Sequence, residues 1–130
     1  MRRVCLVDDD ILVRDALALG LGDAGYQVTT APGAAAGLDI MARTPVDALV
    51  TDINMPGTDG GQLIAEVRAR WPILPIVVIS GTSVVDGHAL METARQLGAD
   101  AAIVKPFRAR QLVDLLDRLI DERARRGETG

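Results

Sequence analysis

Five short apolar runs of strand length recur along this chain of 130 residues, and helix-like segments separate them. The runs cover residues 3–7, 27–31, 46–51, 76–79 and 101–104. The first run does not alternate between apolar and polar residues, which is typical of a strand that is buried on both faces. Strands and helices that alternate regularly predict a parallel sheet with right-handed crossovers. The expected fold class is therefore α/β: a doubly wound, five-stranded parallel sheet with helices on both faces.

Glycine and proline residues mark the ends of the expected helices. Gly25 and Gly98 follow two of them, and Pro45 blocks the continuation of another. The helices are predicted at about residues 11–24, 33–43, 61–70, 87–97 and 109–122. Because the sequence shows no linker, internal repeat or low-complexity segment, it predicts one domain over residues 1–122 and a polar, fraying tail over residues 123–130.

Composition excludes several classes of protein. A formal charge of −4 and only three aromatic residues offer no basic or base-stacking surface to nucleic acid. Cys5 is the only cysteine, which fits a reducing compartment, and its place in an apolar run indicates a buried structural thiol. No apolar run approaches the ~18 residues of a membrane span, and the N-terminus lacks the pattern of a signal peptide. We expect a cytoplasmic chain that binds neither membrane nor nucleic acid, with His88, the single histidine, as an ordinary surface residue.

Polar side chains follow four of the five predicted strands. Asp8 and Asp9 come after the first strand, Asp52 after the third, Ser80 after the fourth and Lys105 after the fifth. A single aspartate at a strand end is most often a turn former. Since the carboxyl ends of parallel strands meet at one edge of the sheet, where ligands bind in such folds, these side chains are expected to lie together. The sequence therefore predicts a functional site at this edge.

The predicted cluster suits phosphoryl chemistry. Three nearby carboxylates repel one another, and one lysine does not balance their charge. A divalent cation with a preference for oxygen would do so, and the lack of nearby cysteine or histidine favours Mg²⁺ over zinc. With Asp8 and Asp9 holding the metal, Asp52 is a candidate nucleophile that would form an aspartyl phosphate. The metal and Lys105 would neutralise the phosphoryl oxygens, and Ser80 would donate a hydrogen bond to one of them.

With these residues in view, the chain resembles the receiver domain of bacterial response regulators over about residues 2–121. Each of the motifs that carry the resemblance is weak alone, but together, in order and at the expected strand ends, they are highly specific. They are Val7-Asp8-Asp9-Asp10, Thr51-Asp52-Ile53-Asn54-Met55-Pro56-Gly57-Thr58-Asp59-Gly60, Ile79-Ser80-Gly81 and Val104-Lys105-Pro106-Phe107. The resemblance implies a flavodoxin-like sheet with the strand order 2-1-3-4-5.

The same resemblance assigns the metal site. It implies that Asp52 is the phosphoacceptor and that Asp8 and Asp9 are the acidic pair, with Asp9 preferred as the direct ligand. The backbone carbonyl of Asn54 matches a further protein ligand, and Asp52 itself contributes to the same site. The expected cofactor is Mg²⁺, with Mn²⁺ as a substitute. Asp10 falls outside the acidic pair and is expected to be a helix N-cap.

The resemblance also assigns the groups that respond to phosphorylation. Ser80 matches the hydroxyl that turns toward the phosphoryl group, and Lys105 matches the lysine that pairs with it. The peptide between Lys105 and Pro106 is expected to be cis. Receivers often carry Tyr or Phe three residues before this lysine, where this chain has Ala102, so the coupling of Ser80 to the surface formed by the fourth helix, fifth strand and fifth helix is expected to be altered or absent.

The leading functional hypothesis is a signalling protein and not a turnover enzyme. A sensor histidine kinase or a histidine phosphotransfer protein donates phosphate to Asp52, and a partner then reads or receives it; homodimerisation through the surface named above is a further possibility. No output domain follows in the sequence, so the chain is read as a stand-alone receiver or as a fragment of a longer regulator. Arg123, Arg125 and Arg126 fit either the start of a linker or, preferably, a basic helix end.

Three alternatives remain open. A Mg²⁺-dependent phosphatase with an aspartate nucleophile would resemble this site, but such enzymes need a second aspartate where the chain has Asn54, and a substrate cap that it lacks. A flavin-binding protein of the same topology would need a phosphate-binding loop where the chain has three aspartates. A pseudo-receiver, which folds and binds partners without taking phosphate, is kept open by Ala102.

Overall fold

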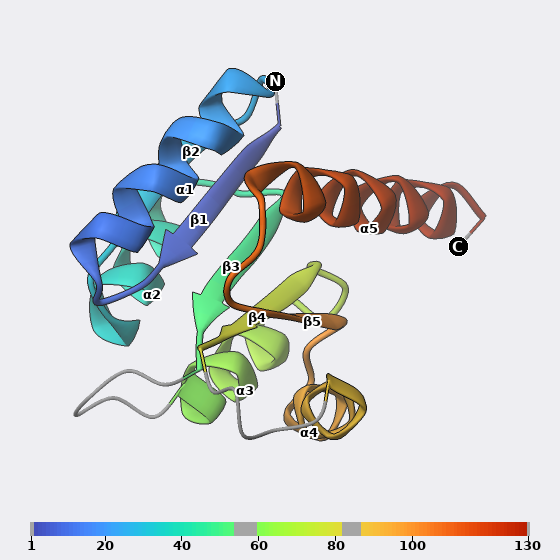
Figure 1. The fold of residues 1–130 in the computed structure, drawn as a ribbon. Coiled ribbons are helices and arrows are strands. Elements are labelled where there is room, and N and C mark those ends of the chain that lie inside the picture. Colours follow the sequence, from blue (N-terminus) through green and yellow to red (C-terminus); the bar gives the residue numbers. More distant parts are fainter. Residues whose placement is uncertain (1, 54–59, 82–86, 130) are drawn as a thin grey trace.

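The computed structural model describes residues 2–53, 60–81 and 87–129, and it contains the predicted parallel sheet (Figure 1). The strand order is β2-β1-β3-β4-β5, and all four neighbouring pairs are parallel. The strands are β1 (Arg3–Val7), β2 (Gln27–Ala31), β3 (Ala48–Asp52), β4 (Ile76–Ser80) and β5 (Ala101–Val104). The predicted fold class and strand order are thus confirmed.

Helices cover both faces of the sheet. They are α1 (Ile11–Asp23), α2 (Ala34–Arg43), α3 (Gly60–Arg70), α4 (Gly87–Leu97) and α5 (Ala109–Thr129). One apolar core joins the sheet to α2, α3 and α4, and a second joins the other face to α1 and α5. Figure 1 shows α3 and α4 on the side of the sheet opposite α5. Because β3 and β4 are covered on both faces, every residue of these two strands is buried.

Two glycines terminate helices as predicted. Gly25 after α1 and Gly98 after α4 have φ angles of 98° and 106°, a left-handed conformation that glycine adopts without the steric cost of a Cβ atom. These turns lead the chain into the amino ends of β2 and β5. None of the helices in the described ranges has the length and apolarity that a membrane crossing requires.

The last helix is longer than the sequence predicts. We expected it to end near residue 122 and the tail to fray, but α5 extends to Thr129 and includes residues 123–129. Arginine, alanine and glutamate are good helix formers, and no proline interrupts the segment, so the helix continues past its packed part. In Figure 1 this end of α5 projects beyond the sheet.

Candidate functional site

Four side chains from different strand ends meet at the carboxyl edge of the sheet. Asp52 and Ser80 are the last residues of β3 and β4, whereas Asp8 and Lys105 directly follow β1 and β5. Asp8, Asp52 and Ser80 are buried, with 0%, 4% and 2% of their surface exposed. The strands beneath them are mainly aliphatic, with the buried Thr51 of β3 as an exception. The sequence prediction that these four residues share one edge is thereby met.

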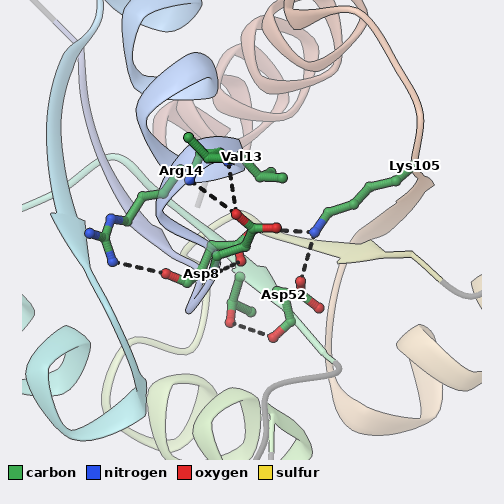
Figure 2. A network of polar contacts seen from close by, with 8 residues as sticks. Asp8, Val13, Arg14, Asp52 and Lys105 are labelled. Carbon is green, nitrogen blue, oxygen red and sulfur yellow. Dashed lines mark hydrogen bonds and ion pairs between the residues drawn. The ribbon is translucent and has the colours of Figure 1, made fainter.

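Lys105 connects the two buried carboxylates. Its Nζ atom lies 2.8 Å from Asp52 Oδ2 and 3.3 Å from Asp8 Oδ2, and Figure 2 shows the side chain reaching toward both. Burial lowers the pKa of Lys105, but the hydrogen bond to Asp52 and the charges of Asp52 and Asp8 outweigh it and leave the pKa raised. The lysine, the only one in the sequence, is therefore charged at neutral pH.

The surroundings of Asp8 disfavour its charged form, so its pKa is raised. Burial raises its pKa, and the neighbouring charge of Asp52 raises it further. The hydrogen bond that its Oδ1 accepts from the Asp10 N–H at 2.9 Å and the charge of Lys105 act in the opposite direction without cancelling the effect. The site thus carries more negative charge than Lys105 neutralises, as the sequence analysis expected.

The surplus charge fits a divalent cation. Carboxylate oxygens of Asp8, Asp9 and Asp52 lie within 4.8 Å of one another, with Asp9 exposed and the other two buried. An all-oxygen donor set that opens to solvent on one side is the kind that Mg²⁺ accepts while keeping several water ligands. The structure does not describe Asn54, so its predicted carbonyl ligand lies outside the described residues.

Several smaller predictions can be checked at the same edge. Asp10 caps α1, since its Oδ1 accepts hydrogen bonds from the N–H groups of Leu12 and Val13 at 3.0 and 3.3 Å. The peptide between Lys105 and Pro106 is cis. Ala102 lies half-buried in β5. The predictions for Asp10 and the cis peptide are confirmed.

Cys5 is buried as expected, and burial raises the pKa of its thiol to about 11. The side chain of His88 lies outside the described part of the chain.

Two residues to which the sequence analysis gave no role contact the backbone of the acidic cluster. Arg14, on α1, donates from Nη1 to the carbonyl oxygen of Asp8 at 3.1 Å, as Figure 2 shows. Thr51, on β3, donates from Oγ1 to the carbonyl oxygen of Asp52, also at 3.1 Å. In the sequence, Thr51 was one of several β-branched strand residues and Arg14 one of many arginines. The only available signal was the hydroxyl directly before Asp52 in an otherwise aliphatic run.

Comparison with known proteins agrees with this geometry. The family model of the response regulator receiver domain matches residues 4–117. Response regulator protein FleR of Pseudomonas aeruginosa is 40% identical over 116 residues, which are 89% of this chain but 24% of that protein. Transcriptional regulatory protein PrrA of Mycobacterium leprae is 39% identical over 127 residues, covering 98% of this chain and 52% of that protein. The chain thus spans about a quarter to a half of these relatives.

Solved structures show the same similarity at the level of the fold. A response regulator receiver domain protein (CheY-like) from Methanospirillum hungatei superposes with a TM-score of 0.87 and 25% identity, and the match covers 97% of this chain and 98% of that one. The receiver domain of NtrX from Brucella abortus superposes with a TM-score of 0.82 and 31% identity over 91% of this chain and 98% of that one.

Proposed function

The chain belongs to the response regulator receiver domain family, and from that premise we propose that Asp52 accepts a phosphoryl group in a Mg²⁺-dependent reaction. The donor is a sensor histidine kinase or a histidine phosphotransfer protein, and the phosphorylated form then binds a partner or passes the group on. The observation that carries the proposal is the arrangement of Asp52, buried and 2.8 Å from Lys105, among two further carboxylates that share the same edge.

Each residue of the edge has a role in this transfer. A carboxylate oxygen of Asp52 forms the new O–P bond while the P–N bond to the donor imidazole breaks, and the imidazole leaves with its electron pair. Asp8 and Asp9 would hold the metal, which supplies positive charge for the phosphoryl oxygens. Lys105, already charged and pointing at Asp52, pairs with a phosphoryl oxygen, and the Ser80 hydroxyl donates a hydrogen bond to another.

Apolar surface beside the site supports docking of a protein donor. Ile11 and Leu12, in the first turn of α1, are 58% and 79% exposed, although large apolar side chains are usually buried. The same helix also lines a mainly apolar cavity of about 260 Å³, whose walls are Val13, Ala16, Leu17, Lys105, Pro106 and Phe107. A donor that contacts this surface would hold its phosphorylated histidine over Asp52.

The phosphatase alternative is weaker because the site lacks an acid that could protonate a leaving group at the position of Asn54. We therefore propose a phosphoacceptor that assists its own phosphorylation and dephosphorylation and does not turn over an external substrate. One of the relatives is named a transcriptional regulatory protein. For this chain we propose the step of such a regulatory system in which phosphorylation is sensed.

An amide NMR titration tests the proposed function. Spectra of the Mg²⁺ form are recorded before and after addition of beryllofluoride, which mimics an aspartyl phosphate, with Asp52→Asn as the control. We expect shifts at Asp52, Ser80 and Lys105 that the control does not show. Shifts that spread into α4 and α5 would establish a switch that works with Ala102, whereas shifts confined to the edge would favour a phosphate shuttle. Spectra that do not change would contradict the proposal and favour the pseudo-receiver.

A further inference from the structure

Thr51, the residue before Asp52, carries a buried hydroxyl that the proposed reaction does not use. It has no exposed surface. The strand register places it between Val7 of β1 and Val78 of β4, and both valines belong to the apolar core that joins the sheet to α2 and α3. Valine would fill such a position with nearly the same shape. A buried hydroxyl, in contrast, must find a hydrogen-bond partner or destabilise the fold.

The partner of this hydroxyl is the peptide that follows Asp52. Thr51 Oγ1 donates to the carbonyl oxygen of Asp52 at 3.1 Å. The other polar end of the same peptide is the N–H of Ile53, which donates to the carbonyl oxygen of Ile79 on β4 at 3.0 Å. The peptide plane is therefore held from both sides, by a side chain of its own strand and by the backbone of the neighbouring strand.

We propose that Thr51 is a positioning residue of the phosphoacceptor site, an inference that rests on the proposed function. Its hydroxyl fixes the peptide after Asp52 and thereby the backbone from which the Asp52 carboxylate extends toward Lys105 Nζ, 2.8 Å away. A carboxylate that is 4% exposed has little room to correct a rotated backbone with its own side chain. Metal coordination and phosphoryl transfer both require reacting atoms at defined positions, so a small rotation of this peptide weakens both.

The test compares Thr51→Val, which keeps the shape and removes the hydroxyl, with Thr51→Ser, which keeps the hydroxyl and removes the methyl group. Mg²⁺ affinity is measured by calorimetric titration, and phosphorylation is followed with acetyl phosphate as the donor. Loss of one hydrogen bond predicts that T51V lowers the Mg²⁺ affinity and the phosphorylation rate by about three- to tenfold. T51S stays within about twofold of the parent protein, because the hydroxyl is retained.

Stability measurements separate positioning from folding. Thr51→Val keeps the shape of the side chain but takes from the buried carbonyl of Asp52 the donor that the structure gives it, so the melting temperature should fall. Val78→Ala is the matched control: it removes methyl groups from the same core face, which should lower the melting temperature while leaving the Mg²⁺ affinity unchanged. Parent-like affinity and rate in T51V, or equal losses in T51V and T51S, would overturn the inference.

A measurement without metal or phosphate distinguishes failure of this inference from failure of the proposed function. The carbonyl ¹³C shift of Asp52 in the metal-free protein reports on the hydrogen bond from Thr51. We expect it to change in T51V and to stay near the parent value in T51S. A parent protein that takes no phosphoryl group would refute the proposed function, whereas an unchanged carbonyl shift in T51V would refute the role of Thr51 whatever the parent does.

Discussion

Charged side chains are paired at the amino end of the sheet, whereas negative charge is in excess at its carboxyl end. At the amino ends of β4 and β5, Arg68 donates to the carbonyl oxygens of Gly98, Pro72 and Leu74 at 2.9, 2.9 and 2.8 Å and pairs with Asp100 at 2.9 Å. The Asp100 carboxylate also accepts from the Ile76 N–H at 2.8 Å. At the carboxyl ends, three carboxylates lie together, and Lys105 contacts two of them.

This difference distinguishes residues that stabilise the fold from the residues to which we assign the proposed chemistry. Arg68 and Asp100 are matched in charge, and Arg68 donates four hydrogen bonds, all of them within the chain. Asp8 is buried with a raised pKa, and the proposed cation would balance the excess negative charge around it. We therefore expect substitutions at the amino end to change stability alone, and substitutions at the carboxyl end to change binding, with small or even favourable effects on stability.

The largest effect is expected from Arg68→Ala. It removes four hydrogen bonds and leaves Asp100 without its ion-pair partner, which predicts a loss of about 2–3 kcal/mol in unfolding free energy. The melting temperature should fall by roughly 10 °C, whereas the Mg²⁺ affinity should not change. Arg43→Ala is the control, because its ion pair with Asp39 on α2 is exposed and predicts a loss of ~0.5 kcal/mol or less. Similar melting temperatures for the two variants would contradict the claim that charge pairs at the amino end of the sheet stabilise the fold.

The next effect concerns the acidic residues after β1. Asp9→Ala removes a proposed metal ligand and should weaken Mg²⁺ binding by roughly tenfold or more, since even the loss of groups that only orient a ligand has effects of that size. Asp10→Ala removes the cap of α1 and should lower stability by about 1 kcal/mol with little effect on Mg²⁺. Calorimetric titration of both variants measures the difference, and equal losses of affinity would show that the acidic pair is misassigned.

A smaller effect, on stability, is expected from Asp8→Asn. Because burial raises the pKa of Asp8 above that of the unfolded chain, the folded state favours the protonated carboxyl. The associated stability is present at low pH and is lost as the pH rises through the raised pKa. The substitution should therefore stabilise the metal-free protein at neutral pH, by about 1 kcal/mol or less, and the gain should vanish on acidification. Urea unfolding at several pH values tests this; a gain that does not depend on pH would contradict it.

The effect of Mg²⁺ on the unfolding free energy tests the proposed metal site at the carboxyl end of the sheet. A ligand that binds only the folded state raises the unfolding free energy. Millimolar Mg²⁺ should therefore stabilise the parent protein and have a smaller effect on Asp8→Asn, in which one carboxylate of the proposed site is neutral. Equal stabilisation of both proteins would place the metal elsewhere.

The smallest change in metal binding is expected from Lys105→Ala. Lys105 contacts Asp8 and Asp52 but has no lone pair for a metal while it is protonated, so Mg²⁺ affinity should stay within about threefold of the parent. The beryllofluoride-dependent shifts at Asp52 and Ser80, and any that reach α4 and α5, should be reduced, because the lysine can no longer pair with the bound group. Amide spectra of this variant that match those of the parent would show that Lys105 takes no part in the response.

The strands, the helices and the edge at which the site lies could be predicted from the sequence, because they follow from hydrophobic periodicity and from the parallel arrangement of the strands. Lys105 and Asp8 are 97 residues apart, yet they could be placed together because both follow buried strands of one parallel sheet. The strand order itself came from the resemblance to receivers and was confirmed by the structure. The roles of Asp52, Ser80 and Lys105 in phosphoryl transfer stay predictions.

Contacts between irregular segments could not be predicted in this way. Arg68 and Asp100 are 32 residues apart, and no pattern in the sequence marks an arginine at a helix end as the partner of the turn before β5. The end of α5 was misjudged because a polar composition suits a solvated helix as well as a frayed tail. Thr51 was overlooked because strand propensity alone explains a β-branched residue at that position.

Phosphorylation of the intact protein tests the central claim most directly. The parent protein and Asp52→Asn are incubated with acetyl phosphate, with and without Mg²⁺, and their masses are measured by mass spectrometry. We predict that the parent gains the mass of one phosphoryl group only when Mg²⁺ is present and that Asp52→Asn gains none. A phosphoryl group on Asp52→Asn, or none on the parent in the presence of Mg²⁺, would contradict the assignment of Asp52 as the phosphoacceptor.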